Sequence, residues 1–360
     1  MALPFFDGGG RKKRDQLLAI DLGGRTTKAV HIQRQGEDFV LNRYALLDAP
    51  IYEKSLSVEL LTEHLKAIGQ ALEARSKSAV IALGVNEAFL RHVEMPRLPV
   101  EDMRLVLKNN PKAYLQQDLP NHSYDCFIIP PRTIRPNPAE AAAKAAGAAP
   151  KLKVLVAGAK NQLVNDFLLA TRNAGLMADS LVPGILGPVN AFELAMPEVF
   201  GKEVVALVDV GFKSSSICIL LEGELVLSRV VALGGDRLTT GLAESMSISY
   251  AEAEGIKVGM ASEVQPSLEA MLLPLGRELR ASLDFFEHQH DRPVTQVFLS
   301  GASSRSEFLA QSLQNEMMVE CKTWNPAGFL QMALPPQQAA EMDQVSSQLT
   351  VAIGAAVGAF

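Results

Sequence analysis

One short pattern occurs twice in this chain and limits the folds available to it. In the first copy an apolar run leads into Asp21-Leu-Gly-Gly-Arg-Thr-Thr-Lys28, and another apolar run follows. The second copy starts 188 residues later, where Asp209-Val-Gly-Phe-Lys-Ser-Ser-Ser216 lies between apolar runs of its own. An acid and a glycine between two such runs indicate a β-hairpin. A single Asp-x-Gly turn is common, but two in equivalent settings predict a duplicated fold.

The residues of these turns suit a phosphate ligand. Glycine lets the backbone approach a ligand closely, and exposed N–H groups, hydroxyls and a lysine bind phosphate oxygens. Asp21 and Asp209 have the hard oxygen ligands that Mg²⁺ prefers, and they could hold the ion through its water shell. Two similar lobes that face each other would bring both turns to one cleft.

The apolar periodicity predicts a similar order of elements after each turn. After the first hairpin we predict a strand at 38–44, a helix over 58–72 and a strand at 79–83. Three strands recur from residue 204, and Leu233-Gly234-Gly235 then turns into a helix. A long helical region follows, in which Pro274 should kink or split the helix. The strand at 294–299 ends in Ser300-Gly301-Ala302, a glycine turn that could admit a flat ring or an anion.

Residues 89–174 are predicted to form a separate small module. We expect strands at 89–94, 124–129 and 152–157, with helices over 101–114 and 161–173. Within it, 14 of the 21 residues of segment 130–150 are Pro, Ala or Gly, which is typical of a flexible insertion. A strand near 178–182 and a helix near 185–194 lead into the second half, and the chain closes with a small-residue helix.

Composition excludes several classes of protein. The net charge of −6 gives no reason to expect a nucleic-acid partner. The three cysteines are scattered and odd in number, which favours buried thiols in a reducing compartment. No segment approaches the roughly 20 apolar residues that cross a bilayer, and the N-terminal basic cluster follows a very short apolar run, the reverse of a secretory signal. We therefore predict a cytoplasmic protein with no direct membrane span.

Together these segments resemble the actin-like ATPase superfamily, and within it the PilM family of type IV pilus assembly proteins, which is related to FtsA. The two Asp-x-Gly turns are similar to its phosphate loops. Ala253-Glu254-x-x-Lys257, by itself an ordinary surface ion pair, is similar to the ribose-contacting helix, and Ser300-Gly301-Ala302 to the adenosine loop. More particular to PilM are Phe5-Phe6 before glycines and basic residues, Ala174-Gly175-Leu176, and the segment 282–286.

The resemblance implies an α/β protein of the actin-like ATPase fold, with two duplicated β-β-β-α-β-α lobes around a nucleotide cleft and an inserted FtsA-type small subdomain. Residues 1–16 would be a flexible tail. The first lobe would consist of 17–88 and 175–201, and the inserted subdomain of 89–174 with its flexible loop 130–150. The second lobe would span 202–345, and the closing helix 346–360 would pack on the first lobe.

It also implies the ligands. Mg-ATP would lie between the lobes, with the metal held through water by Asp21 and Asp209. The partner would be the N-terminal cytoplasmic tail of a PilN-like inner-membrane protein, docked beside the small subdomain, so that the chain is peripheral to the inner membrane. Other pilus assembly proteins and self-association are further expected contacts. The cofactor-binding residues would be Asp21, Gly23, Gly24, Thr26, Thr27, Lys28, Asp209, Gly211, Ser214, Gly234, Gly235, Glu254, Lys257, Gly301 and Ala302.

Some residues depart from the family pattern. Ala302 replaces a second glycine of the adenosine loop, and Arg25, Phe212 and Lys213 are bulkier than expected in phosphate loops. Nucleotide binding is therefore better supported than hydrolysis, and we assign no catalytic residue. Two alternatives stay open: an FtsA-like filament protein of cell division, and a small-molecule kinase, for which no carboxylate aimed at a substrate hydroxyl is identifiable.

Overall fold

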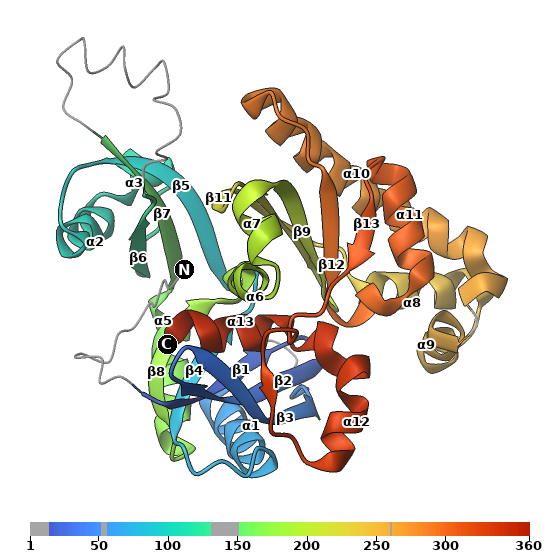
Figure 1. Ribbon diagram of the computed structural model, residues 1–360, viewed down its shortest axis with the longest axis horizontal. Coiled ribbons are helices and arrows are strands. Elements are labelled where there is room, and N and C mark those ends of the chain that lie inside the picture. The colour runs from blue at the N-terminus through green and yellow to red at the C-terminus, as the bar shows by residue number, and fades with distance from the viewer. Residues whose placement is uncertain (1–13, 52–55, 131–150, 260) are drawn as a thin grey trace.

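The computed structural model describes residues 14–51, 56–130, 151–259 and 261–360. The predicted tail over residues 1–16 lies outside them up to residue 13, and so does the predicted loop 130–150 except for Pro130. The described chain forms three β-sheets with helices between and around them (Figure 1). This is an α/β architecture, as predicted.

The first lobe is built on a six-stranded sheet whose central strands are buried on both faces. All residues of β4 and the inner residues of β1 are buried, which explains their unbroken apolar runs. Alternate residues of β1 face α1 and α5 on one side and α6 and α13 on the other. The sheet order is β14 (Gln331–Met332), β3 (Asp38–Asp48), β2 (Thr26–Gln35), β1 (Gln16–Leu22), β4 (Ser78–Leu83), β8 (Met177–Pro183).

The helices of this lobe begin and pack as their local sequence requires. Ser57 accepts a hydrogen bond from the Leu60 N–H at 3.2 Å and so caps α1, as an N-cap serine should. The three-to-four-residue spacing of Leu61, Leu65 and Ile68 places all three in the core under the sheet. The helical elements are α1 (Val58–Ala71), α5 (Asn161–Asn173), η1 (Gly184–Leu186), α6 (Gly187–Ala195), α7 (Pro197–Lys202), α12 (Pro336–Val345), η4 (Ser346–Gln348) and α13 (Thr350–Ala359). The second lobe was predicted to extend to residue 345, but β14 pairs with β3 and Gln338 of α12 bonds to Tyr44, so both elements belong to the first lobe.

The second lobe repeats the strand order of the first. In both sheets the first strand is antiparallel to the second and parallel to the fourth. The repeat of the Asp-x-Gly pattern therefore reflects a duplicated sheet, as predicted. Its order is β11 (Glu224–Val231), β10 (Ser215–Leu221), β9 (Val204–Val210), β12 (Gln296–Ser300), β13 (Cys321–Thr323), with α8 (Gly235–Met246), α9 (Tyr250–Gly259), η2 (Ala261–Val264), α10 (Gln265–His290), η3 (Ala302–Arg305) and α11 (Glu307–Met317).

Two helix predictions that involve proline had different outcomes. Pro274 does not split α10, which continues from Gln265 to His290, because Leu272, Leu275 and Leu279 are buried on the second lobe and hold the helix against the sheet. The helix predicted over 101–114 is two helices, α2 (Val100–Asn109) and α3 (Pro111–Leu115). The backbone of Asn110 departs from helical torsion angles, with φ −145°, because the helical conformation is disfavoured for a residue that precedes proline.

The small subdomain is a three-stranded antiparallel sheet covered by α2 and α3. Its order is β5 (Ala88–Pro96), β7 (Lys151–Lys160), β6 (His122–Ile128). Met95, Met103 and Val156 lie in its own core. Helix α5, which follows β7, packs on α1 of the first lobe instead. Strand β5 reaches the second lobe, where His92 Nε2 lies 2.7 Å from the Leu225 carbonyl oxygen.

The C-terminal helix α13 crosses the centre of the molecule (Figure 1) and packs against α6 and the first-lobe sheet. Its small residues allow an unusually close helix contact. A Cβ on Gly354 would lie 1.8 Å from the Gly187 carbonyl oxygen, so no larger residue fits there without movement of the backbone. Asn190 Nδ2 donates to the Gly354 carbonyl oxygen at 3.1 Å and ties the two helices together.

Candidate functional site

The first Asp-x-Gly turn joins β1 to β2 and depends on glycine. The β1–β2 register places Asp21 opposite Lys28, and Lys28 Nζ lies 3.2 Å from Asp21 Oδ2. A Cβ on Gly23 would lie 2.5 Å from Lys28 Nζ and from the Thr26 carbonyl oxygen. The turn therefore closes around a salt bridge, with an acid and a base side by side at its mouth.

Thr27 is separated from this group by the alternation of the strand. Its side chain is fully buried, and Oγ1 lies 2.7 Å from His64 Nε2 on α1. Successive residues of a strand face opposite sides, so the Thr27 hydroxyl contacts α1 while Lys28 faces the turn. Burial lowers the pKa of His64, which favours its neutral ring. The structure does not bring the Thr27 hydroxyl together with the other predicted ligands.

The second turn follows β9 and is supported by β12. Ser300 Oγ donates to Asp209 Oδ1 at 2.8 Å, and the parallel register pairs these two residues. Burial raises the pKa of Asp209; the Ser300 hydrogen bond and the charge of Lys28 oppose that shift, and the charge of Asp21 adds to it.

Gly211, Gly234 and Gly235 pack their backbones together behind this turn. The Gly235 N–H donates to the Gly211 carbonyl oxygen at 3.0 Å. A Cβ on Gly234 would lie 2.4 Å from the Phe212 carbonyl oxygen, and one on Gly211 would lie 2.7 Å from that of Ser214. Helix α8 begins at Gly235, so its N-terminus, which favours anions, adjoins the second turn.

Glu254 and Lys257 lie on one face of α9 and form an ion pair at 2.7 Å. Thr239 on α8 completes the cluster: its Oγ1 donates to Glu254 Oε2 at 2.5 Å and accepts from Lys257 Nζ at 2.7 Å. Burial would raise the pKa of Glu254, but the bonds from Lys257 and Thr239 and the charges of Lys257 and Arg25 outweigh it and hold that pKa low. The carboxylate is therefore a preformed hydrogen-bond acceptor.

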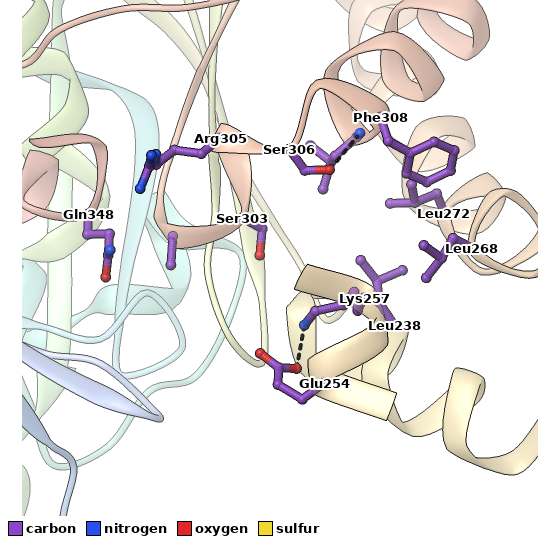
Figure 2. A pocket seen from close by; sticks show the side chains of 12 residues that line it. Leu238, Glu254, Lys257, Leu268, Leu272, Ser303, Arg305, Ser306, Phe308 and Gln348 are labelled. Carbon is purple, nitrogen blue, oxygen red and sulfur yellow. Dashed lines mark hydrogen bonds and ion pairs between the residues drawn. The ribbon is translucent and has the colours of Figure 1, made fainter. Parts of the chain in front are cut away.

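A cavity of about 400 Å³ opens beside this pair, a size that suits a small-molecule ligand. Figure 2 shows leucine and phenylalanine side chains on one side of it and Ser303, Arg305 and Gln348 on the other. Gly301, with φ +92°, begins the turn that borders it, and a Cβ there would lie 2.5 Å from the Val210 carbonyl oxygen. The lining residues are Leu238, Glu254, Lys257, Leu268, Leu272, Ala302, Ser303, Arg305, Ser306, Phe308, Leu309 and Gln348.

Two residues beside the Asp-x-Gly turns, Asn86 and Glu87, were not predicted from sequence. Asn86 Nδ2 donates to Ser214 Oγ at 2.6 Å, a bond from the first lobe to the second turn. Its neighbour Glu87 accepts from the Gly84 N–H at 2.9 Å. Loss of solvent raises the pKa of Glu87, the Gly84 bond opposes this, and the charge of Asp21 adds to it. Both residues follow the buried strand β4. Ligands bind at the carboxyl ends of parallel strands, so their position directly after a buried strand could have identified them from sequence.

The two predicted metal ligands, Asp21 and Asp209, lie near the ends of β1 and β9, one at each Asp-x-Gly turn. Within the described ranges, no group of three or more His, Cys, Asp or Glu side chains is placed to hold a metal ion. Two carboxylates can support a cation that is bound largely through its own water.

No helix in the described part of the chain is both long and apolar enough to cross a membrane.

Comparison with known proteins places this architecture in a family. The sequence profile of the family described as "Type IV pilus assembly protein PilM" matches residues 19–360, nearly the whole chain. The chain belongs to the PilM family. A solved chain of a "PilM-PilN type IV pilus biogenesis complex" is similar in fold, with a TM-score of 0.81 at 22% identity over 97% of this chain and 100% of that one.

More distant relatives share the fold. EutJ from Carboxydothermus hydrogenoformans superposes with a TM-score of 0.54 at 13% identity over 97% of this chain and 91% of that chain. MreB5 of Spiroplasma citri, solved with AMPPNP, gives 0.50 at 10% identity over 96% of each chain. In sequence, FtsA of Bacillus subtilis (strain 168) is 29% identical over 103 residues, 29% of this chain but only 22% of FtsA. The sequence similarity to FtsA is thus confined to one segment of 103 residues.

The PilM-like segment 282–286 lies away from the cleft, on α10. Leu283 and Phe286 are buried in the second-lobe core, whereas Phe285 is 56% exposed. Ala174-Gly175-Leu176 is a turn between α5 and β8 in which Gly175 takes φ +76°, a conformation that favours glycine. These two resemblances are therefore explained by packing and turn geometry.

Proposed function

We propose that this chain binds Mg-ATP between its lobes and serves as a platform in type IV pilus assembly. The observation that carries the nucleotide half is that the two Asp-x-Gly turns meet: a Cβ on Gly24 would lie 3.5 Å from the Phe212 ring, and Arg25 Nη1 lies 2.7 Å from Glu254 Oε1. A ligand that carries both a chain of phosphates and a flat ring suits this arrangement, because the cavity of about 400 Å³ continues from Glu254 and Lys257 past Ala302.

The residues present fit such a ligand in chemistry and in space. A Cβ on Gly23, Gly211 or Gly234 would lie within 2.7 Å of atoms of the turns themselves, so glycine is needed for these tight turns, and we propose that their backbone N–H groups bind phosphate oxygens. Lys28, the hydroxyl of Thr26 and that of Ser214 add donors. Mg²⁺, when bound, would neutralise phosphate charge, with Asp21 and Asp209 accepting hydrogen bonds from its water. Glu254 and Lys257 would hold the ribose, and Gly301 and Ala302 would border the base.

The partner half of the proposal rests on the family and on the small subdomain. A neighbour in fold is a PilM chain solved with PilN, and we propose that this chain docks the N-terminal cytoplasmic tail of a PilN-like inner-membrane protein. Among the described strands, β6 pairs with β7 alone, so an extended peptide could add to that edge. The chain would then be cytoplasmic and peripheral to the inner membrane.

Nucleotide and partner would be linked through the contacts of the small subdomain. Strand β5 starts directly after Asn86 and Glu87 at the cleft and carries His92, which contacts Leu225 of the second lobe. A ligand that favours one arrangement of the lobes changes the affinity for a partner only if the partner also distinguishes the arrangements. The β5 contacts supply a physical route for that difference.

A thermal-shift titration with Mg-ATP tests the proposal. Nucleotide at a hundredfold above its dissociation constant should stabilise the fold by about 2.7 kcal/mol. Asp21→Ala and Asp209→Ala should each abolish the shift, because the triphosphate then lacks its magnesium. Asp38→Ala is the matched control, since Asp38 lies at the far end of the β2–β3 hairpin. Absence of any shift in wild-type protein that releases no nucleotide on heating would refute the assignment.

A further inference from the structure

Arg25 in the first turn connects both lobes at the mouth of the cleft. Its Nη1 lies 2.7 Å from Glu254 Oε1 on α9. Its guanidinium carbon lies 5.8 Å from the centre of the Phe212 ring, in the second turn. One side chain of the first lobe thus holds two separate segments of the second, a carboxylate by charge and an aromatic face by cation–π attraction.

The contact occupies the one oxygen of Glu254 that its own lobe leaves available. Oε2 is already bonded to Lys257 and Thr239, whereas Oε1 is bonded to Arg25. A ribose hydroxyl that donates to Oε1 of Glu254 would share that oxygen with the guanidinium, which already lies 2.7 Å from it. Burial of the pair is incomplete, with side-chain exposures of 47% for Arg25 and 20% for Glu254, so the pair is weak enough to be displaced.

Arg25 also stands where the two phosphate turns approach each other. A Cβ on its neighbour Gly24 would lie 3.5 Å from the Phe212 ring and 3.6 Å from the Lys213 side chain. Phosphates that extend from the ribose helix to the two turns must pass this point. A guanidinium matches phosphate oxygens with two parallel hydrogen bonds, which makes a phosphate a better partner than one carboxylate oxygen.

We propose that Arg25 is a clasp that holds Glu254 in the nucleotide-free cleft and exchanges it for phosphate when nucleotide enters. The residue would set which nucleotides bind well: one with phosphates compensates for the lost Glu254 contact, and a bare nucleoside does not. This inference rests on the proposed function and adds a residue that determines specificity within it.

The test compares adenosine and Mg-ATP binding by wild type and Arg25→Ala, using calorimetry for ATP and equilibrium dialysis for adenosine. Removal of the Arg25 side chain frees Glu254 from its ion pair. Adenosine affinity should therefore rise about 2- to 5-fold, the factor that corresponds to the free energy of one exposed ion pair. ATP affinity should fall roughly 10- to 100-fold, because charged hydrogen bonds to phosphate are lost. A variant with mere structural damage would lose affinity for both ligands.

Arg34→Ala is the matched control. Arg34 also pairs with a glutamate, Glu37 at 3.8 Å, and lies 5.8 Å from the Phe39 ring centre, but it is at the far end of β2. It should bind both ligands as wild type does. If Arg25→Ala gains no adenosine affinity while wild type binds ATP, the clasp is refuted and the nucleotide site stands. If wild type fails to bind ATP, the proposed function itself fails.

Discussion

The contact between α13 and α6 predicts opposite outcomes for the same substitution at two helix glycines. In Gly354→Ala the new Cβ would lie 1.8 Å from the Gly187 carbonyl oxygen, where ordinary contact begins at 3.4 Å. In Gly69→Ala, on α1, the nearest atom outside the helix backbone is a Leu176 methyl at 4.0 Å. Both positions are helical, so the helix propensity gained is similar and only the surroundings differ.

The expected magnitude for Gly354→Ala follows from three contributions. Overpacking of a close-packed contact costs about 1–3 kcal/mol, because the helices must separate by roughly 1.5 Å in a rigid core. Separation also stretches the bond from Asn190 to the Gly354 carbonyl oxygen, which is worth about 1 kcal/mol. The higher helix propensity of alanine relative to glycine offsets about 1 kcal/mol of this cost. The net destabilisation is about 2 kcal/mol.

Differential scanning calorimetry measures both variants in the same buffer. With an unfolding entropy of about 2.1 cal/mol/K per residue, the melting temperature of a chain of 360 residues shifts by about 1.3 °C per kcal/mol, so Gly354→Ala should melt roughly 3 °C below wild type. Gly69→Ala should melt at or slightly above wild type, with a gain of up to about 1 kcal/mol. An unchanged or higher melting temperature for Gly354→Ala would refute the steric argument. A comparable loss in Gly69→Ala would show that helix glycines matter here for a reason other than this contact.

Two further predictions concern the small subdomain. Burial lowers the pKa of His92 and the charge of Lys153 lowers it further, whereas the hydrogen bond to Leu225 and the charge of Glu224 oppose the shift. Because His92 takes up a proton less readily in the folded state than in the unfolded state, the folded state loses stability as the pH falls below about 6.5, the unfolded pKa. His92→Gln should lose less melting temperature than wild type between about pH 7.5 and 5.5, and equal losses would contradict this. Purified protein should bind the PilN-like N-terminal peptide in a peptide titration but not anionic vesicles; tight vesicle binding that disappears without residues 1–14, with no peptide binding, would favour an FtsA-like anchor.

Much of the fold and part of the site are encoded locally. The unbroken apolar runs of β1 and β4 predict buried strands, the repeated Asp-x-Gly turns predict the duplicated sheet, and Ser57 predicts the start of α1. The three-residue spacing of Glu254 and Lys257 is sufficient to place both on one face of a helix. These features depend on residues a few positions apart, and the period of the backbone translates their spacing into geometry.

Other features were decided only by packing. The cross-lobe contact of Arg25 with Glu254 joins residues 229 positions apart, and that of Asn86 with Ser214 joins residues 128 apart. The face that Thr27 presents to α1 and the unbroken course of α10 through Pro274 depend on which surfaces are buried. A local pattern gives each element its period and its apolar face, whereas the partner of that face is set by the packing of the whole chain. That is why the sequence alone determined the two Asp-x-Gly turns, and the tertiary structure alone decided how the two lobes hold each other.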